Sequence, residues 1–351
     1  MAEINFGVVG AGAISGSSCR EISAHPRAKL VAACDLHAGR LHQLQSTFSI
    51  PTIYPTAEAL IQDSAINAVY IAVPNVHHVP IALQALHAGK HVILDKPFAL
   101  NLQQAREVAD LAEQQDTVFM LGMNQRFVAG AQAIKTMVAR GDLGEIYHGR
   151  AFWMRRSGIP RMGTWFGSKE LAGGGSLLDI GVHLLDLALY ILDNFEPVSV
   201  SGATYSKFGP RGLGEGGWGL SDREEIPFDV DDFATALIRL KGGVSVTLDV
   251  SWALHQRDSN LMNVNLFGTE AGATVYPAEV YRYGDHQGEY QLLQNPSVEP
   301  QYDHNSRFFN FINSILGEEQ PCVTIEQALA VQSIIDAIYQ SCQSGKEVRF
   351  N

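Results

Sequence analysis

Over residues 1–123, short apolar runs alternate with stretches whose apolar positions repeat as in helices. Continuous apolar strands of this kind are typical of a parallel sheet that helices cover on both faces. In such sheets, ligands bind beyond the carboxyl ends of the strands. The pattern therefore predicts a doubly wound α/β domain with a binding crevice at the strand ends. The predicted strands are residues 4–9, 29–34, 68–73, 91–94 and 118–122.

The turn after the first of these strands is rich in glycine and begins at Gly10. Gly10 would allow a tight turn, and Gly12 would let a pyrophosphate group approach the backbone. Ala13 and Ile14 then lead into a helix whose free N–H groups and positive dipole end attract phosphate. Ser15 stands where a third glycine would be and is small enough for close packing of the helix on the strand. Strand, glycine turn and helix together predict a Rossmann domain that binds a dinucleotide.

An acidic residue, Asp35, directly follows the second predicted strand, 23 residues after Gly12. A carboxylate at this place can accept hydrogen bonds from both ribose hydroxyls of an adenosine and would repel a 2′-phosphate. The sequence therefore favours NAD over NADP as the cofactor. Arg40 lies close enough in the sequence to keep NADP open. The alternative is a turn with an acidic cap and no ligand.

Polar segments also follow three of the later strands, where a ligand is expected. They are Pro74-Asn75-Val76-His77-His78, Asp95-Lys96-Pro97 and Asn124-Gln125-Arg126. Pro74, Asn75, His78 and Lys96 are candidate cofactor contacts, and Arg126 is a candidate substrate contact. A lysine at a strand end, held by the following proline, would point into the crevice. The alternative for Lys96 is a surface lysine whose ammonium group lies in bulk water.

Residues 173–190 combine three glycines with a helix candidate that is apolar almost all the way round. Such a helix is normally buried, yet Asp179, His183 and Asp186 interrupt it, and helical spacing places them on one face. A carboxylate one turn from an imidazole can orient that ring, so Asp179 and His183 are predicted to form a general acid–base pair. The glycines would let another molecule approach closely. The alternatives are a pair that satisfies itself inside a core, or two ligands of a metal ion, for which no third ligand is evident.

A basic and aromatic segment, residues 153–166, stands out in a chain whose formal net charge is −12. Aromatic rings pack against the C–H faces of sugars, and guanidinium groups bind hydroxyls, carboxylates or phosphates. Arg155, Arg156 and Trp165 are therefore candidate substrate-binding residues, and the alternative is a solvated loop with structural aromatics. Further along, the glycine-rich stretch 206–222 predicts a mobile surface loop.

The second half of the chain contains strands with a period of two. In residues 244–252, one face is apolar and the other carries serine, threonine and aspartate. Residues 233–240 and 262–267 accompany this strand, and amphipathic helices at 305–316 and 325–340 close the chain. The pattern predicts an α+β domain with a large, mostly antiparallel, open-faced sheet. Because its polar face is open to water or to another subunit, a homodimer or homotetramer is expected.

The length of 351 residues exceeds what one compact core usually holds, and we divide the chain into domains at residues 1–123 and 124–351. The acidic balance disfavours nucleic acid as a partner. The four cysteines are widely scattered and are predicted to be reduced thiols. Neither a signal peptide nor an apolar run of transmembrane length is visible, so we expect a cytoplasmic protein without membrane contact.

Over nearly its full length, the chain resembles the glucose–fructose oxidoreductase / inositol dehydrogenase / MocA family (Gfo/Idh/MocA). The resemblance runs from the glycine turn through Pro74-Asn75 with His78, then Asp95-Lys96-Pro97, to the pattern GGG-x-x-x-D-x-G-x-H-x-x-D that begins at Gly173. The last two motifs are specific to the family. The family usually has Glu-Lys-Pro, and the shorter Asp95 should still leave the lysine in place.

This resemblance implies a nicotinamide-dependent oxidoreductase that acts on a secondary hydroxyl of a sugar or cyclitol. Lys96, Asp179 and His183 fall on the catalytic positions of the family. We expect His183, oriented by Asp179, to take the hydroxyl proton and Lys96 to hydrogen-bond the same oxygen, although these two roles could be exchanged. One alternative is a glycosidase that oxidises its substrate transiently and returns the cofactor unchanged. Another is a nucleotide-binding regulator without catalytic activity.

Overall fold

The computed structural model describes residues 3–219, 226–284, 288–299 and 301–350. Its first sheet has six parallel strands in the order β3-β2-β1-β4-β5-β6. The order reverses beside β1, which places a crevice at the carboxyl ends of β1 and β4, as in other doubly wound sheets. These strands are β1 Ile4–Val9, β2 Ala28–Cys34, β3 Thr52–Tyr54, β4 Ala68–Ile71, β5 His91–Leu94 and β6 Phe119–Leu121. The helices that follow them are α1 Ser15–Ala24, α2 Ala38–Phe48, α3 Ala57–Ile61, α4 His78–His87 and α5 Leu102–Ala112.

The second sheet has nine strands in the order β14-β13-β12-β11-β7-β10-β9-β8-β15. Every neighbouring pair is antiparallel except β7 with β10. The predicted fold class, a Rossmann domain followed by an α+β domain with a large antiparallel sheet, is confirmed. The strands are β7 Ile146–Arg155, β8 Pro197–Tyr205, β9 Phe233–Leu240, β10 Ser245–Ser251, β11 Asn260–Gly268, β12 Gly272–Thr274, β13 Glu279–Tyr283, β14 Tyr290–Gln294 and β15 Val348–Arg349.

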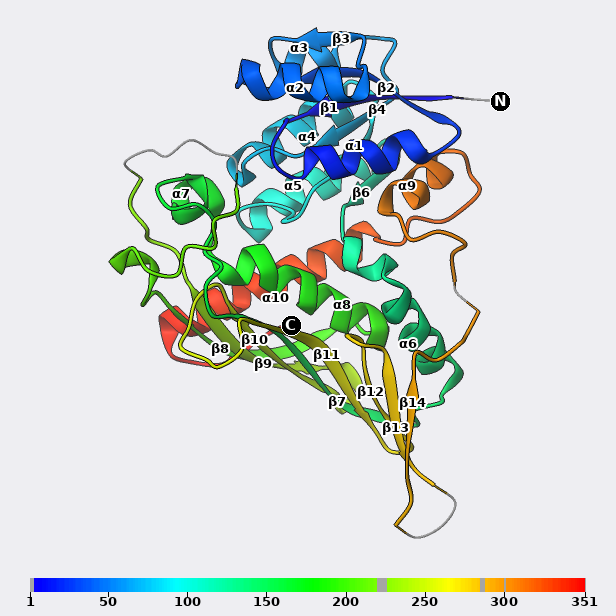
Figure 1. Cartoon of the computed structure of the whole chain (residues 1–351), viewed down its shortest axis with the longest axis vertical. Coiled ribbons are helices and arrows are strands. Elements are labelled where there is room, and N and C mark those ends of the chain that lie inside the picture. Colours follow the sequence, from blue (N-terminus) through cyan, green and yellow to red (C-terminus); the bar gives the residue numbers. More distant parts are fainter. Residues whose placement is uncertain (1–2, 220–225, 285–287, 300, 351) are drawn as a thin grey trace.

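Helices cover only one face of this second sheet and lie between it and the first sheet (Figure 1). In β10, Val246, Leu248 and Val250 are buried beneath these helices, while Thr247 and Asp249 lie half-exposed on the other face. The period of two in the sequence therefore separates a packed face from an open one, as predicted. The covering helices are α6 Ala129–Arg140, α8 Val182–Leu192 and α10 Ile325–Ser344.

The segment that leads into α8 is the buried core of the second domain. Among the described residues, Lys169–Leu192 is long and apolar enough to cross a membrane, so the prediction that no run reaches that length is wrong. However, 89% of its apolar window is buried inside the protein, which marks it as a core helix. It contains α7 Lys169–Ala172 and a π-helical turn, η4 Leu177–Gly181, before α8.

The glycines of this segment serve the packing of the chain on itself. A Cβ atom on Gly175 would lie 1.8 Å from the carbonyl oxygen of Asp231, and one on Gly174 would lie 2.0 Å from the hydroxyl of Tyr339. The expectation that the glycines admit another molecule is therefore wrong for Gly175, whereas Gly174 also lines a cavity between the domains. They are needed because neighbouring segments of the same protein touch their backbone.

The end of the chain returns to the first sheet. Helix α9 Arg307–Ile315 packs against α1, and α10 packs against α5 and β6. Figure 1 shows α9 beside the first sheet and α10 running between the two sheets. A boundary at residue 123 consequently separates the two sheets, while part of the following sequence helps to cover the first one.

Candidate active site

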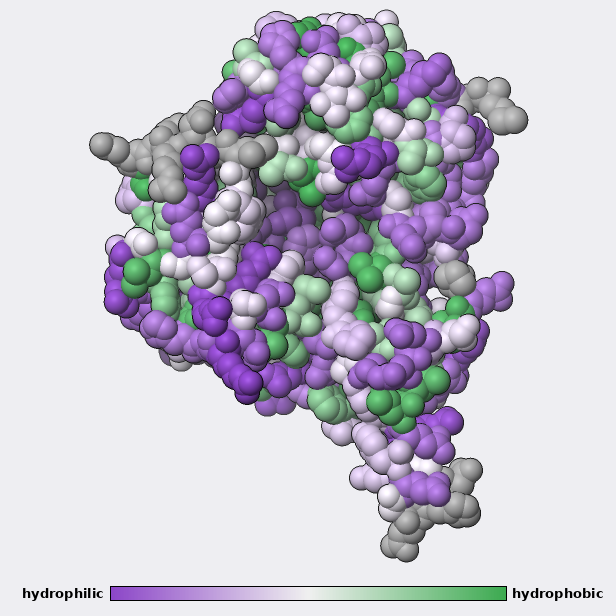
Figure 2. Space-filling view, viewed as in Figure 1, coloured by the Kyte–Doolittle hydropathy of each residue, from purple (hydrophilic) through white to green (hydrophobic). Residues whose placement is uncertain are grey.

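A cavity of about 590 Å³ lies where the strand ends of the first sheet face the segment before α8. The surface is hollowed between the two domains at this place (Figure 2). Most of the predicted site residues line it, although they come from segments far apart in the sequence. The predicted residues that line the cavity are Gly10, Gly12, Ala13, Ile14, Asp35, Pro74, Asn75, His78, Lys96, Arg155, Trp165, Asp179 and His183.

The glycine turn has the geometry that a bound dinucleotide requires. Gly10 has a φ of +103°, and a Cβ atom there would lie 2.2 Å from the carbonyl oxygen of Ala72. A Cβ atom on Gly12 would meet no atom within 4 Å, so the backbone is open to the cavity. The hydroxyl of Ser15, which replaces the third glycine, donates to the carbonyl oxygen of Gly10 at 2.7 Å. The turn is therefore both closed on itself and accessible to phosphate.

Asp35 is held beside this turn by backbone amides. Its Oδ2 accepts from the amide of Ala11 at 2.6 Å, and its Oδ1 accepts from the amide of His37 at 2.6 Å. A guanidinium nitrogen of Arg40 lies 4.0 Å from Oδ1. The carboxylate therefore borders the cavity next to the glycine turn, where an adenosine ribose would meet it.

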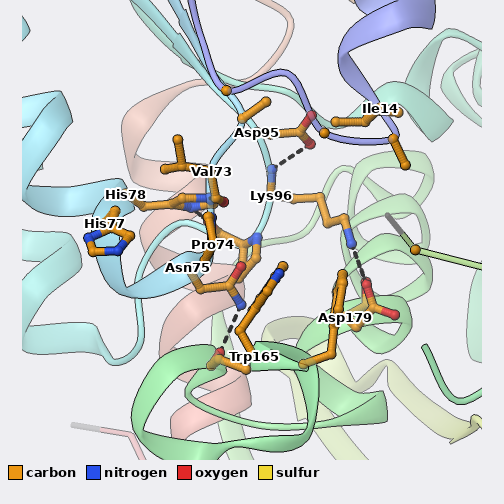
Figure 3. A pocket seen from close by; sticks show the side chains of 18 of the residues that line it. Ile14, Val73, Pro74, Asn75, His77, His78, Asp95, Lys96, Trp165 and Asp179 are labelled. Carbon is orange, nitrogen blue, oxygen red and sulfur yellow. Dashed lines mark hydrogen bonds and ion pairs between the residues drawn. The ribbon is translucent and has the colours of Figure 1, made fainter. Parts of the chain in front are cut away.

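Asn75 and His78 brace the loops at the strand ends. The side-chain amide of Asn75 donates to the carbonyl oxygen of Ala172 at 2.8 Å and so links the first sheet to α7 (Figure 3). The two ring nitrogens of His78 lie 2.8 Å and 2.9 Å from the carbonyl oxygens of Pro97 and Val73. Burial lowers the pKa of this imidazole. The His78 ring thus positions the backbone on either side of the crevice.

Lys96 and Asp179 meet across the cavity (Figure 3). The ammonium group of Lys96 donates to Asp179 Oδ1 at 2.6 Å and to its carbonyl oxygen at 2.9 Å. The indole N–H of Trp252 donates to Asp179 Oδ2 at 2.9 Å. Burial would raise the pKa of Asp179, but the Lys96 charge and these hydrogen bonds outweigh it and hold the pKa below its usual value. The carboxylate is therefore ionised and fixed.

His183 does not form the predicted pair with Asp179. Lys96 and Trp252 take up both carboxylate oxygens of Asp179, and Nδ1 of His183 is buried with no hydrogen-bond partner among the described residues. The π-helical turn, which departs from the α-helical spacing assumed from the sequence, precedes this residue. Burial and then the charge of Lys96 lower the pKa of His183 to about 3, so the imidazole is neutral at physiological pH.

Two family models match this chain. Residues 4–123 match an oxidoreductase family with an NAD-binding Rossmann fold, and residues 131–274 match the GFO/IDH/MocA C-terminal domain. The protein belongs to the Gfo/Idh/MocA family of oxidoreductases. The resemblance seen in the sequence is confirmed, and the first domain of this Gfo/Idh/MocA protein is an NAD-binding Rossmann fold.

Relatives of this Gfo/Idh/MocA protein include named sugar dehydrogenases. The D-glucoside 3-dehydrogenase of Escherichia coli K12 is 33% identical over 322 residues, which cover 91% of this chain and 90% of that protein. The levoglucosan dehydrogenase of Pseudarthrobacter phenanthrenivorans is 30% identical over 63% of this chain and 58% of its own. A crystal structure titled levoglucosan dehydrogenase in complex with NADH and levoglucosan has a TM-score of 0.84 at 21% identity, with 99% of both chains covered, and so shares the fold.

Arg126, predicted to bind substrate, is instead a buried structural residue. Its side chain is fully buried and donates to both carboxylate oxygens of Asp186, at 2.5 Å and 2.9 Å. It also donates to the carbonyl oxygen of Cys322 and to the side chain of Gln327, each at 2.6 Å. The short helix Asn124–Phe127 after β6 turns this side chain beneath α8 and away from the cavity.

Arg156 also lies outside the cavity. It is exposed, and its guanidinium donates to the carbonyl oxygen of Arg257 at 3.0 Å. Arg155, its neighbour, points to the opposite side and lines the cavity, as expected for adjacent residues at the end of a strand.

The stretch 206–222, predicted to be a mobile surface loop, is hydrogen-bonded to another loop in its described part. The carbonyl oxygen of Gly214 accepts from the amides of Gly158 and Ile159, both at 2.9 Å. Residues 220–222 lie outside the described residues.

Sequence reasoning missed three groups of residues around the site. Trp252 holds Asp179 in place through a hydrogen bond. In the sequence, its position at the end of a predicted strand was the one feature that could have indicated this role. Trp218 lines the cavity from the glycine-rich stretch, where no periodic pattern marked it. Arg307, from α9, forms an ion pair with Asp95 at 3.2 Å, while Asp95 also accepts from the amide of Lys96 at 2.8 Å. The chain end therefore helps to hold the loop that carries Lys96.

Proposed function

We propose that this protein is an NAD-dependent dehydrogenase that oxidises a secondary hydroxyl of a sugar, a sugar derivative or a cyclitol. The observation that supports it best is the Lys96–Asp179 ion pair beside a neutral His183, inside a cavity that also contains the glycine turn. The names of the relatives make D-glucosides and levoglucosan the first substrates to test.

The cofactor site is supported by the fit of the residues that border it. Gly10 and Gly12 would cradle the pyrophosphate with the amides of Ala13 and Ile14, and Asp35 would accept the ribose hydroxyls. Its carboxylate favours NAD over NADP, because a 2′-phosphate would meet a negative charge. When NAD is bound, its nicotinamide ring accepts a hydride from the substrate carbon that carries the hydroxyl.

The catalytic residues have complementary tasks in this proposal. An ammonium group has three N–H donors, and Lys96 gives two hydrogen bonds to Asp179, which leaves one for the substrate oxygen. That contact holds negative charge as it develops on the oxygen. The imidazole of His183 lines the same cavity and accepts the hydroxyl proton, with the roles of Lys96 and His183 open to exchange. Asp179 keeps Lys96 in place, and Trp252 keeps Asp179 in place.

A product assay tests this proposal against its alternatives. Purified protein is incubated with NAD⁺ and a panel of aldoses, anhydrosugars, methyl glycosides and inositols, and both NADH and the sugar products are measured. Net NADH together with an oxidised sugar is the expected result. Cleavage of a glycoside without net NADH would establish the glycosidase instead. Nucleotide binding without turnover on any of these sugars would overturn the dehydrogenase proposal.

We also propose that the protein is a cytoplasmic homodimer or homotetramer that pairs through the open face of the second sheet. Apolar side chains on this face remain partly exposed in the monomer, which a partner subunit would cover. Sedimentation at micromolar concentration should show an assembly, and a monomer would contradict it. The exposed apolar residues on this face include Tyr205, Leu237, Leu261 and Phe267.

A further inference from the structure

Five side chains of the second domain form a continuous wall of the cavity, which we call the aromatic wall: Trp153, Arg155, Trp165, Phe166 and Trp218. The ring of Trp153 lies 6.2 Å from the ring of His183, and the Arg155 guanidinium lies 4.4 Å from the centre of the Trp153 ring. Further contacts link Arg155 to Trp218, Trp218 to Phe166, and Phe166 to Trp165. The wall therefore includes one ring, that of Trp153, beside His183.

Three aromatic rings in mutual contact form part of the wall. Trp165 and Phe166 stack with centroids 3.8 Å apart, and Phe166 meets Trp218 edge to face at 5.4 Å. All three rings are half-buried although they border a cavity large enough for a ligand. Half-buried aromatic rings that line a cavity are suited to a ring-shaped partner with an apolar face.

The backbone that carries these rings is tied together before any ligand binds. The loop around Gly158 and the loop around Trp218 share several hydrogen bonds. The Trp218 indole N–H donates to the carbonyl oxygen of Gly158 at 3.0 Å, and the amide of Arg161 donates to the carbonyl oxygen of Trp218 at 3.0 Å. The amide of Gly216 donates to the carbonyl oxygen of Ile159 at 2.8 Å. A preorganised wall loses little freedom when a ligand packs on it.

Arg155 adds polar capacity to the wall. Its guanidinium lies over the Trp153 ring and 5.9 Å from the centre of the Trp218 ring, and it forms no side-chain hydrogen bond with the described residues. Its guanidinium therefore has N–H donors available to a ligand in the cavity that it lines. Stacked on an aromatic ring, such a group can bind hydroxyls at the edge of a second ring.

We propose that the aromatic wall is a subsite for a second ring joined to the sugar that is oxidised. This inference rests on the proposed dehydrogenase function and extends it: the preferred substrates are glycosides with a ring as the aglycone. The oxidised sugar lies by Lys96 and His183, and the second ring packs on Trp218 and Phe166. Both a sugar ring and an aromatic aglycone have the apolar face that this subsite requires.

The first experiment compares one-ring and two-ring substrates of the same sugar. Initial rates of NADH formation are measured for methyl glucoside, phenyl glucoside and a glucosyl-glucose disaccharide. We expect kcat/KM to be about tenfold higher for at least one two-ring substrate, mainly through a lower KM, because stacking adds binding energy remote from the reacting carbon. A gain with phenyl glucoside alone assigns the subsite to an aromatic aglycone, and a gain with the disaccharide assigns it to a sugar.

The second experiment removes the stacking ring. Trp218→Ala should abolish most of this preference, so that the ratio of kcat/KM between two-ring and one-ring substrates falls about tenfold. Trp218→Phe keeps a ring and should retain most of the ratio, which guards against a folding defect. Tyr147→Ala is the matched control, because Tyr147 lies on the same strand as Trp153 but is 55% exposed. Its ratio should equal that of the wild type.

A binding measurement gives a second readout that does not depend on turnover. Three of the four tryptophans line the cavity, so phenyl glucoside bound to the NADH-loaded protein should change the intrinsic fluorescence. Its dissociation constant should rise about tenfold in Trp218→Ala. Equal kcat/KM for one-ring and two-ring substrates in the wild type would overturn the subsite while leaving the dehydrogenase intact. The absence of NADH with every sugar would instead overturn the proposed function itself.

Discussion

Two ion pairs connect the segment 177–192 to loops that follow strands of the first sheet, and their surroundings differ. The Lys96–Asp179 pair has side chains that are 19% and 11% exposed, and both residues line the cavity. The Arg126–Asp186 pair is 0% and 1% exposed, with no contact to the cavity. The two carboxylates are seven positions apart in one helical segment, yet one faces a ligand site and the other faces the core.

The difference shows how the ion pair that we propose to be catalytic is separated from a structural one. The guanidinium of Arg126 has four hydrogen bonds to protein oxygens and lies 4.9 Å from the centre of the Tyr190 ring. Four of its five N–H donors are used and its side chain is 0% exposed, so removing its partner would leave a buried charge. Lys96 has one donor left and a cavity in front of it. Its spare hydrogen-bonding capacity is what the proposed chemistry requires.

The largest predicted effect is expected for Lys96, from the Lys96–Asp179 pair that faces the cavity, and for His183 in the same cavity. Lys96→Met and His183→Ala should each lower turnover by roughly 10²–10⁴-fold, because each removes a group that we propose to act on the substrate oxygen. The double variant should lose less than the product of the two, since both groups act on the same proton and charge. Steady-state rates and the melting temperature are measured together, with NAD affinity as a further check.

The matched control for this prediction is Lys241→Met, which breaks the exposed Lys241–Glu196 pair far from the cavity. Its turnover should be that of the wild type. Should His183→Ala be fully folded and fully active, His183 would have no place in the mechanism. A loss of activity that only follows the folded fraction would make Lys96 and His183 structural residues.

The next prediction concerns the buried Arg126–Asp186 pair, where we expect a loss of stability in place of a loss of turnover. Arg126→Met should lower the free energy of unfolding by about 3–5 kcal/mol, because Asp186 would stay buried without its partner. Changing both residues, Arg126→Met with Asp186→Leu, should recover much of that loss. The control is Lys135→Met, whose partner Asp193 is exposed, with an expected cost below about 1 kcal/mol. Urea unfolding measures all three, and a stable Arg126→Met protein would contradict the assignment.

The contrast between Lys96 and Arg126 also shows which site residues could be predicted from the sequence. The alternation of strands and helices, the glycine turn and Asp35 predicted the first domain, because each depends on residues close together in the chain. Lys96 could be placed at the crevice because the carboxyl end of a parallel strand fixes where the next residues lie. Arg126 follows a strand in the same way, but the short helix after β6 turns it into the core. Hydrophobic periodicity carries no signal for that turn.

Direct contacts between distant segments could not be predicted from local patterns. Asp179 was paired with His183 from helical spacing, whereas its partners are Lys96 and Trp252, which lie 83 and 73 positions away. The Asp95–Arg307 ion pair spans 212 positions. Burial alone would raise the pKa of Asp95, but Arg307 and Tyr70 lower it to about 2. Such partners depend on how the two domains pack, which local patterns do not encode.

A third carboxylate, Asp35, sharpens the comparison because it accepts from two backbone amides at 2.6 Å, while a cation, the Arg40 guanidinium, lies 4.0 Å away. Asp35→Ser should weaken NAD binding by about 1–3 kcal/mol and narrow the preference over NADP, since hydrogen bonds from the ribose to a charged group are lost. Calorimetry with both cofactors measures the change. Turnover at saturating NAD should fall much less than in Lys96→Met. A wild-type preference for NADP would show that this interpretation of Asp35 is wrong.

The smallest predicted effect is the loss of folding stability at low pH that His183 causes. Its pKa is about 3 in the folded protein and near 6.5 in the unfolded chain, so the unfolded state binds the proton first. The corresponding stability is fully present above pH 6.5 and is lost as the pH falls toward 3. Over the upper part of that window, Asp179 stays ionised in both states, because its unfolded pKa is 3.8 and its folded pKa is lower still.

Unfolding in urea at about pH 7 and about pH 5 isolates this contribution. His183→Asn has no imidazole to protonate at this position and should lose less stability than the wild type between the two pH values. Other buried histidines such as His78, whose pKa is also lowered, contribute to both proteins and cancel in the comparison. Lys96→Met should give a smaller reduction, because the Lys96 charge is only the second cause of the low His183 pKa. An equal loss in the wild type and His183→Asn would mean that His183 is not held neutral beside the cavity-facing pair.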